Sequence, residues 1–277
     1  MGILVNKKEI ETFVFSGGEC HVKITASEIG DNTDILANLY NANDIMYLLL
    51  AVDAIRRINP KTAITLTMPY IPYARQDRVC NKGEALSIKV MATLINGLKC
   101  DKVIIIDPHS DVTSALINNI IKISLSDIVV NSALATIIHK QTLTLLAPDA
   151  GAEKKVQETA KALSIIGINT DVLCARKTRD PLTGKILETT LHSDCREKNV
   201  IILDDICDGG RTFIELAKTV KEQGGKDLYL YTTHGLFSQG FDTLKRYFKH
   251  IYCYHTMWDK KKLDPTFITI INDTTHE

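Results

Sequence analysis

Short apolar runs alternate along the chain with segments of helical periodicity. Residues 13–24 differ from this pattern and are more typical of an antiparallel hairpin around Gly17 and Gly18. Five apolar runs bounded by polar residues, glycine or proline are typical of buried parallel strands: 63–68, 103–106, 143–147, 200–203 and 228–231. Four segments between or beside them have apolar residues at helical spacing: 45–58, 87–98, 153–163 and 212–222. The alternation predicts an α/β fold with mainly parallel sheets covered by helices.

The two halves of the chain carry a similar segment. Residues 102–111 align without a gap with residues 199–208, and each segment is an apolar strand that ends in aspartate. Upstream, residues 66–69 resemble residues 145–148. The repeat predicts two tandem α/β domains, residues 1–128 and 129–277. The alternative, that any two buried strands ending in aspartate look alike, stays open.

Composition and charge exclude several classes of protein. The 33 basic residues balance 33 acidic ones, which argues against binding to nucleic acid or to an acidic membrane surface. The longest apolar run, residues 45–52, is far too short to span a bilayer, and the first ten residues lack the apolar core of a signal peptide. The seven cysteines are scattered without a Cys-x-x-Cys pair, which predicts reduced thiols in a cytoplasmic protein.

The segment after the predicted strand 200–203 concentrates the candidate chemistry. Asp204 and Asp205 stand at the carboxyl end of that strand, where parallel sheets place their ligands. Residues 208–210, Asp-Gly-Gly, then lead into the helix predicted from Thr212. Glycines let the backbone approach an anion, and the N–H groups at a helix start bind phosphate. The acids suit sugar hydroxyls or a metal ion, and the structural alternative is an ordinary helix cap.

This loop resembles the binding loop of the phosphoribosyltransferases, and further motifs narrow the resemblance to the ribose-phosphate diphosphokinase (phosphoribosyl diphosphate synthase) family. The matching segments keep the family's order over nearly the whole chain: 15–19, 69–78, 107–109, 148–151, 177–179, 204–212 and 233–238. Residues 73–78, Tyr-Ala-Arg-Gln-Asp-Arg, are the most specific of these. The family consists of two tandem phosphoribosyltransferase-like domains, which agrees with the repeat.

The resemblance implies an enzyme that transfers the diphosphoryl group of ATP to the C1 hydroxyl of ribose 5-phosphate, releases AMP and uses Mg²⁺. It implies that His109 and Asp149 hold the metal and that Lys177, Arg179 and His109 are catalytic, with both cations on a mobile lid over residues 176–184. ATP contacts are implied in the N-terminal domain for Phe15, Glu19, Arg75, Gln76 and Asp77. Ribose-phosphate contacts are implied in the C-terminal domain for Asp204, Asp205, Asp208, Gly209, Gly210, Arg211 and Thr212. Family members are homo-oligomers that share the ATP site between subunits, so we expect a homo-oligomer.

Two positions depart from the family pattern and keep alternatives open. Gly17 replaces an aspartate that helps to recognise adenine in the family, so a donor nucleotide with another base stays an alternative. Arg211 replaces a glycine, and its side chain either adds a phosphate contact or points to solvent. A 5-substituted ribose such as ADP-ribose, which would feed NAD synthesis, is therefore an alternative acceptor. A phosphoribosyltransferase and a non-catalytic regulatory relative are further alternatives, and the retained His109 segment argues against both.

Overall fold

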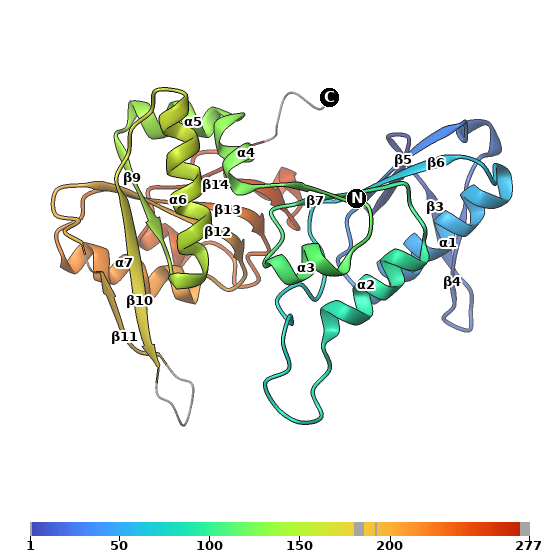
Figure 1. Ribbon diagram of the computed structural model, residues 1–277, viewed down its shortest axis with the longest axis horizontal. Coiled ribbons are helices and arrows are strands. Elements are labelled where there is room, and N and C mark those ends of the chain that lie inside the picture. Colours follow the sequence, from blue (N-terminus) through green and yellow to red (C-terminus); the bar gives the residue numbers. More distant parts are fainter. Residues whose placement is uncertain (1, 180–185, 192, 272–277) are drawn as a thin grey trace. The chain divides into compact units, whose positions relative to one another are not determined.

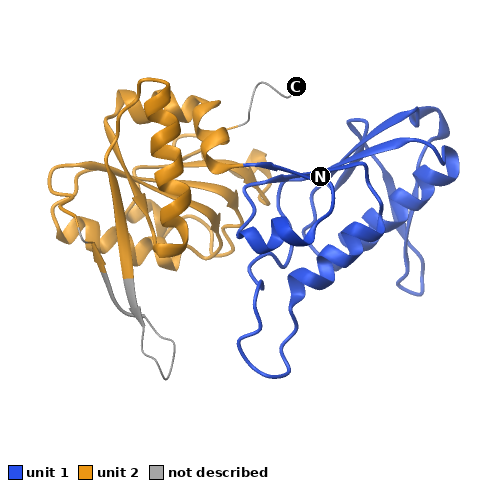
Figure 2. Cartoon of the chain, viewed as in Figure 1, with its two compact units in different colours: residues 1–123 blue, residues 124–277 orange. Residues whose placement is uncertain are grey.

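The computed structural model describes residues 2–179, 186–191 and 193–271, and within strands it leaves out the side chains of residues 177–179 and 186–189. The chain divides into two compact units, residues 1–123 and 124–277 (Figure 2). Residue 128, where the sequence placed the domain boundary, lies in helix α4 (Leu125–Val130) of unit 2. No helix in the described ranges is both long and apolar enough to cross a membrane.

Unit 1 is built on a six-stranded sheet in the order β2-β1-β5-β6-β7-β8. Its strands are β1 (Ile3–Val5), β2 (Lys8–Glu9), β5 (Asn32–Ala37), β6 (Ala63–Met68), β7 (Lys102–Ile106) and β8 (Ile120–Ile123). Strands β5 to β8 are parallel, and β1 pairs antiparallel with β2 and β5. Successive right-handed crossovers in one direction place α1 (Ala42–Ile58) and α2 (Ser87–Gly97) on the same face, and both contribute to one apolar core (Figure 1). The short helix α3 (Asp111–Leu116) joins β7 to β8.

The hairpin predicted around Gly17 and Gly18 is confirmed. Strands β3 (Glu11–Val14) and β4 (Cys20–Lys23) pair antiparallel, and a single turn of 3-10 helix (Ala26–Glu28) follows. The N–H of Phe15 donates to the carbonyl of Glu19 at 2.8 Å and closes the tip. The hairpin packs on α1, with Val22 only 5% exposed.

Unit 2 is built on a seven-stranded sheet in the order β11-β10-β9-β12-β13-β14-β15, parallel except for the β10–β11 pair. Its strands are β9 (Leu143–Ala147), β10 (Val172–Arg179), β11 (Ile186–Leu191), β12 (Asn199–Cys207), β13 (Leu228–Gly235), β14 (His250–Thr256) and β15 (Ile268–Ile270). Its other helices are α5 (Ala133–Lys140), α6 (Ala150–Ile165) and α7 (Arg211–Glu222), with 3-10 turns at Leu244–Arg246 and Lys260–Lys262. From β9 the chain moves through α6 to β10, and from β12 it moves through α7 to β13 in the opposite direction. The point between β9 and β12 is therefore a topological switch point, where α/β sheets bind ligands.

The predicted α/β class with mainly parallel sheets is confirmed, and each predicted strand and helix is present. The repeat matched β6 with β9 and β7 with β12. These strands have equivalent places in the two sheets, because β6 lies beside β7 and β9 lies beside β12. The connections differ, however: α2 alone joins β6 to β7, whereas α6, β10 and β11 lie between β9 and β12. This difference gives unit 2 the switch point that β5 to β8 of unit 1 lack.

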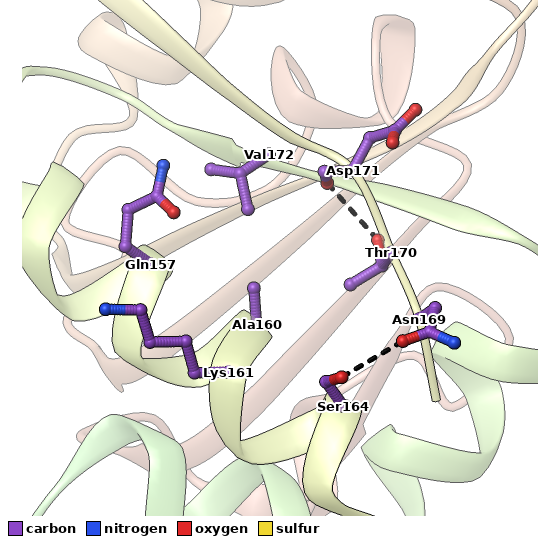
Figure 3. Close-up of a pocket in the computed structure, with 8 residues that line it drawn as sticks. All are labelled: Gln157, Ala160, Lys161, Ser164, Asn169, Thr170, Asp171 and Val172. Atoms are coloured by element: carbon purple, nitrogen blue, oxygen red, sulfur yellow. Dashed lines mark hydrogen bonds between the residues drawn. The ribbon is translucent and has the colours of Figure 1, made fainter. Parts of the chain in front are cut away.

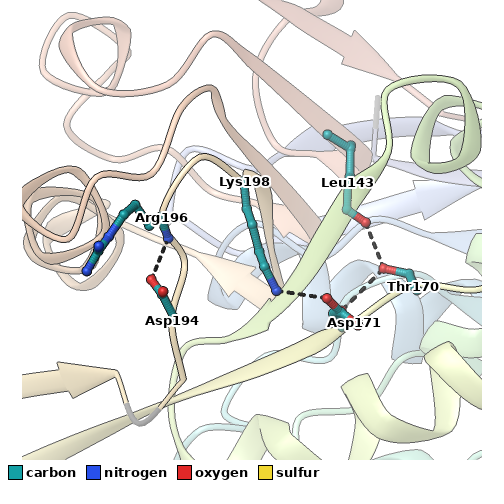
Figure 4. Close-up of polar contacts among 6 residues, drawn as sticks. All are labelled: Leu143, Thr170, Asp171, Asp194, Arg196 and Lys198. Carbon is teal, nitrogen blue, oxygen red and sulfur yellow. Dashed lines mark hydrogen bonds and ion pairs between the residues drawn. The ribbon is translucent and has the colours of Figure 1, made fainter.

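Polar contacts organise the amino-terminal end of the unit 2 sheet. A pocket of about 440 Å³ lies between the end of α6 and the start of β10, lined by Gln157, Ala160, Lys161, Ser164, Asn169, Thr170, Asp171 and Val172 (Figure 3). Beside it, the Lys198 ammonium pairs with Asp171 at 2.8 Å, and the Thr170 hydroxyl donates to the carbonyl of Leu143 at 2.7 Å (Figure 4). Because α6 runs back from the carboxyl end of β9, this pocket lies at the end of the sheet opposite to residues 204–212.

Candidate active site

Acidic residues from two neighbouring strand exits gather at the switch point of unit 2. The register pairs Ile202 of β12 with Leu146 of β9, so both strands end at the same edge of the sheet. After β9, Asp149 is the N-cap of α6, and its Oδ1 accepts from the N–H groups of Gly151 at 3.0 Å and Ala152 at 3.1 Å. The structure thus gives Asp149 the capping role, and it also places this carboxylate close to the exit of β12.

Asp204 and Asp205 follow the buried part of β12. Oδ1 of Asp204 accepts from the N–H of Asp205 at 2.9 Å, and Asp205 is only 7% exposed. Burial of the Asp204 carboxyl, together with the charges of Asp205 and Asp149, raises its pKa well above the ordinary value. Such a site favours a proton, a sugar hydroxyl or a cation beside the carboxylates. Among the described residues, no three acidic, histidine or cysteine side chains come together closely enough to hold a metal ion by themselves.

The start of α7 is open to an anion. Gly210 is its N-cap, has a φ of +77° and provides no side chain to cap the helix. A Cβ at this position would lie 3.0 Å from Cδ2 of Leu244, so both the backbone conformation and the space require glycine. The uncapped N–H groups and the helix dipole favour a phosphate at this point.

A second loop supports the first. The hydroxyl of Ser238 donates to Oδ1 of Asp208 at 2.6 Å, and its N–H donates to the Asp208 carbonyl at 3.2 Å. The N–H groups of Leu236 and Phe237 both donate to the carbonyl of Cys207. Ser238 was not among the predicted site residues. Its signal was the motif at 233–238, which follows β13 just as residues 204–212 follow the buried part of β12.

Arg211 lies on the surface at the first turn of α7. Its Nε pairs with Oε1 of Glu215 at 2.9 Å, and its side chain is 89% exposed. The side chain extends into solvent beside Glu215, and its contact with a phosphate stays a prediction. Thr212 follows it as a partly buried residue of the same turn.

In unit 1, the exits of β6 and β7 lie side by side. The register pairs Met68 with Ile105, so the segment containing Arg75 and the segment containing His109 leave the sheet at the same edge. Arg75 and Gln76 are exposed, Asp77 is half-buried, and His109 is partly buried before α3. These four predicted residues therefore belong to one edge of unit 1.

The hairpin tip is a separate part of unit 1. Phe15 and Glu19 are exposed there, and the Phe15 ring lies 5.1 Å from that of Phe13 and 5.9 Å from that of His21. Figure 1 shows the hairpin well apart from the long loop between β6 and α2. Within one copy of unit 1, the structure does not bring Phe15 and Glu19 together with Arg75.

The predicted lid falls largely outside the described residues. Lys177 and Arg179 belong to β10 by their backbone, and Lys177 pairs with Thr189 of β11. Their side chains, and residues 180–185, lie outside what the structure describes. Their catalytic role stays a prediction.

Replacing Gly210 with alanine is expected to destabilise the protein by about 1–2 kcal/mol, because a left-handed conformation is costly for a residue with a Cβ. Urea unfolding measures the change. Gly17→Ala is the matched control, since nothing lies within 4 Å of a Cβ at Gly17 and its φ is not positive. Equal stability of the two variants would contradict the strained position assigned to Gly210.

A glycine-bearing loop between an acidic strand exit and an uncapped helix, at the switch point of a parallel sheet, defines a phosphate-binding α/β protein of the phosphoribosyltransferase type. Comparisons with known proteins agree. The family model described as "N-terminal domain of ribose phosphate pyrophosphokinase" matches residues 2–98, and the "Phosphoribosyl transferase domain" model matches residues 117–262. The chain belongs to the ribose-phosphate pyrophosphokinase family, as the resemblance indicated.

Relatives and a solved structure support this family. The ribose-phosphate pyrophosphokinase of Hyphomonas neptunium is 30% identical over 236 residues, which cover 84% of this chain and 73% of that protein. The enzyme of the same name from Aquifex aeolicus is 31% identical over 230 residues, 81% of this chain and 70% of that protein. The crystal structure of phosphoribosylpyrophosphate synthetase from Mycobacterium smegmatis superposes with a TM-score of 0.81 at 21% identity and covers 95% of this chain and 86% of that one. It confirms the fold of two tandem domains.

Proposed function

We propose that this chain is a ribose-phosphate diphosphokinase, which transfers the diphosphoryl group of ATP to ribose 5-phosphate. The C1 hydroxyl oxygen attacks the β-phosphorus, the bond from that phosphorus to the α,β-bridging oxygen breaks, and AMP leaves as the hydroxyl loses its proton. The observation that carries the proposal is the exit of β12, where paired acids precede a glycine-capped, open helix start. Family membership supports the same reaction.

We assign binding of the acceptor, ribose 5-phosphate, to unit 2. The backbone from Asp208 through Gly209 and Gly210 to Thr212 would hold the 5-phosphate at the start of α7. Asp204 and Asp205 would accept hydrogen bonds from the ribose hydroxyls, because carboxylates beside a phosphate loop suit neutral hydroxyl donors. The raised pKa of Asp204 supports this assignment, since a hydroxyl donor relieves the crowding of negative charge.

Unit 1 is assigned the nucleotide. Arg75 offers a planar fork for phosphate oxygens, and Gln76 and Asp77 stand next to it on the exposed loop after β6. Phe15 and Glu19 would contact the base. Because the hairpin tip lies apart from that loop in one chain, a nucleotide contacted by both would lie between two copies of the chain. The proposal therefore includes a homo-oligomer.

A divalent cation, proposed as Mg²⁺, would accompany the nucleotide. The oxygen-rich exit of β9 and β12 fits a hard cation, and Asp149 in unit 2 and His109 in unit 1 would hold it. When bound, the ion would neutralise charge on the transferring phosphates. Lys177 and Arg179 would add cationic groups at the same phosphates.

The protein is proposed to work in the cytoplasm without nucleic-acid or membrane partners. All seven cysteines are unbonded, as reducing conditions would keep them. Zero net charge gives no general attraction to polyanions.

Arg211 is the reason to retain a second candidate acceptor. This exposed cation stands beside the proposed phosphate site, where a 5-substituent larger than phosphate, as in ADP-ribose, would extend into solvent. Incubating the protein with ATP and Mg²⁺ and either acceptor, and following AMP release, tests both. We expect acceptor-dependent AMP with ribose 5-phosphate. AMP only with ADP-ribose would establish the second acceptor instead, and AMP with neither would contradict the proposed reaction.

A further inference from the structure

The loop after β13 joins the proposed phosphate site to the one tryptophan of the chain. We call residues 236–238 the bracing loop. Nε1 of Trp258, two residues after the end of β14, donates to the carbonyls of Leu236 and Phe237, both at 3.1 Å. Strands β12 and β14 flank β13, so the bracing loop has residues 207–208 on one side and Trp258 on the other.

The bracing loop is strained at its centre. Phe237 is fully buried and has a φ of +44°, a costly conformation for a residue with a Cβ. Such strain persists only where the surroundings hold the residue in place. The Phe237 ring lies 4.8 Å from that of Phe241, which in turn lies 5.1 Å from the ring of Trp258. Trp258 therefore holds the strained loop through both its indole N–H and its ring.

On its other side, the bracing loop contacts the phosphate loop closely. The N–H groups of residues 236–238 donate to the carbonyls of Cys207 and Asp208 at 2.8 to 3.2 Å, and the Ser238 hydroxyl donates to the Asp208 carboxylate at 2.6 Å. A Cβ at Gly209 would lie only 3.7 Å from Oγ of Ser238. A displacement of the bracing loop would therefore move Asp208 and Gly209, whose backbone is proposed to hold the 5-phosphate.

We propose that Trp258 is a positioning residue for the acceptor site, and that its fluorescence reports occupancy of that site. The indole N–H fixes the bracing loop, and Ser238 of that loop fixes Asp208 in the conformation that receives the phosphate. Trp258 acts through these two residues rather than on the sugar phosphate itself. The inference rests on the proposed binding of ribose 5-phosphate by unit 2.

The first test is a titration of the full chain with ribose 5-phosphate, followed by tryptophan emission. The wild type is expected to show a saturable change, because filling the phosphate loop shifts the carbonyls that the indole N–H contacts. Ser238→Ala retains the fluorophore but lacks the hydroxyl. Its half-saturating concentration is expected to rise about tenfold, the usual effect of losing one hydrogen bond to a charged group. Ser238→Thr, which keeps a hydroxyl, is expected to recover most of the affinity.

The second test is the steady-state rate of AMP release by Trp258→Phe, which keeps an aromatic ring but cannot donate. The KM for ribose 5-phosphate is expected to rise about fivefold with kcat unchanged, because a misplaced phosphate loop weakens ground-state and transition-state binding equally. A tryptophan that only stabilised the core would lower the urea midpoint and leave this KM unchanged. The double variant with Ser238→Ala is expected to match Ser238→Ala alone, since both residues act through one loop.

Ser164→Ala is the matched control for Ser238→Ala, because the Ser164 hydroxyl also donates to a side chain, that of Asn169 at 3.0 Å, but at the opposite end of the sheet. It is expected to titrate as the wild type does. The Ser238→Ala titration tests the relay whether or not Trp258→Phe folds.

Three results would each overturn the inference: unchanged emission at saturation, wild-type affinity in Ser238→Ala, or KM effects that multiply in the double variant. Calorimetry of the wild type separates these from a failure of the proposed function. Absence of ribose 5-phosphate binding there would overturn the proposed acceptor and the inference together, whereas binding with any of the three results would overturn the inference alone.

Discussion

Replacing Lys177 with alanine is expected to lower the turnover number for AMP release by about 100- to 1000-fold, the usual loss when one group that stabilises developing charge is removed. The transferring diphosphoryl group carries several negative oxygens, and a closely placed ammonium stabilises them most in the transition state. The backbone of Lys177 is part of β10, which pairs with β9 on one side and β11 on the other. The fold is therefore expected to survive the substitution, and thermal unfolding checks this.

Lys161→Ala is the control for this experiment. Lys161 lines the pocket between α6 and β10 (Figure 3). This pocket lies at the amino-terminal end of the unit 2 sheet, opposite to the end that carries residues 204–212. Removal of the Lys161 side chain is expected to leave turnover unchanged. If Lys177→Ala retained the wild-type rate, Lys177 would have no part in the mechanism.

The strands whose side chains are buried on both faces were among those that the sequence predicted. Strand β9 is buried at all five positions, and the strand 200–203 is the fully buried part of β12, so both appear as continuous apolar runs. Strand β5 was missed because its outward positions are polar, as in Asn32 and Asp34. Strand β14 was also missed, although residues 251–254 form a short apolar run between His250 and His255.

In the candidate site, the sequence predicted the local features but not the contacts between distant segments. A strand exit and a glycine turn are local features, so the placement of Asp204, Gly209 and Gly210 at the end of β12 followed from their order in the sequence. The bracing of Asp208 by Ser238 joins residues 30 positions apart, and it depends on β13 lying next to β12. Local pattern supplies no information on such a pairing.

The sequence also could not predict the direction in which a side chain points. For Arg211 the sequence left both a phosphate contact and solvent open, and the structure pairs its side chain with Glu215 one helical turn later. Phe15 and Arg75 were assigned to one nucleotide by resemblance, and the separation of the hairpin from the loop after β6 emerged only in three dimensions.

Stability is expected to fall by about 2 kcal/mol between pH 7.5 and pH 5 because of His255 alone, and by about 4 kcal/mol at pH 3.5. Burial, together with the nearby His234 and Lys260, lowers the pKa of His255 to about 3, against an ordinary value of 6.5. The His234 and His255 rings lie 6.1 Å apart at the ends of β13 and β14. Between pH 6.5 and pH 3 the unfolded chain binds a proton that the folded chain does not, so acid favours unfolding throughout this range.

Urea unfolding of the wild type and of His255→Gln at both pH values measures this contribution. Because glutamine does not titrate, the variant is expected to lose about 2 kcal/mol less than the wild type between pH 7.5 and pH 5, whatever its stability at pH 7.5. His139→Gln, on the exposed side of α5, is expected to keep the wild-type dependence. Parallel losses in the wild type and His255→Gln would show that His255 takes up its proton equally well in the folded chain, and that its surroundings in unit 2 admit the charge.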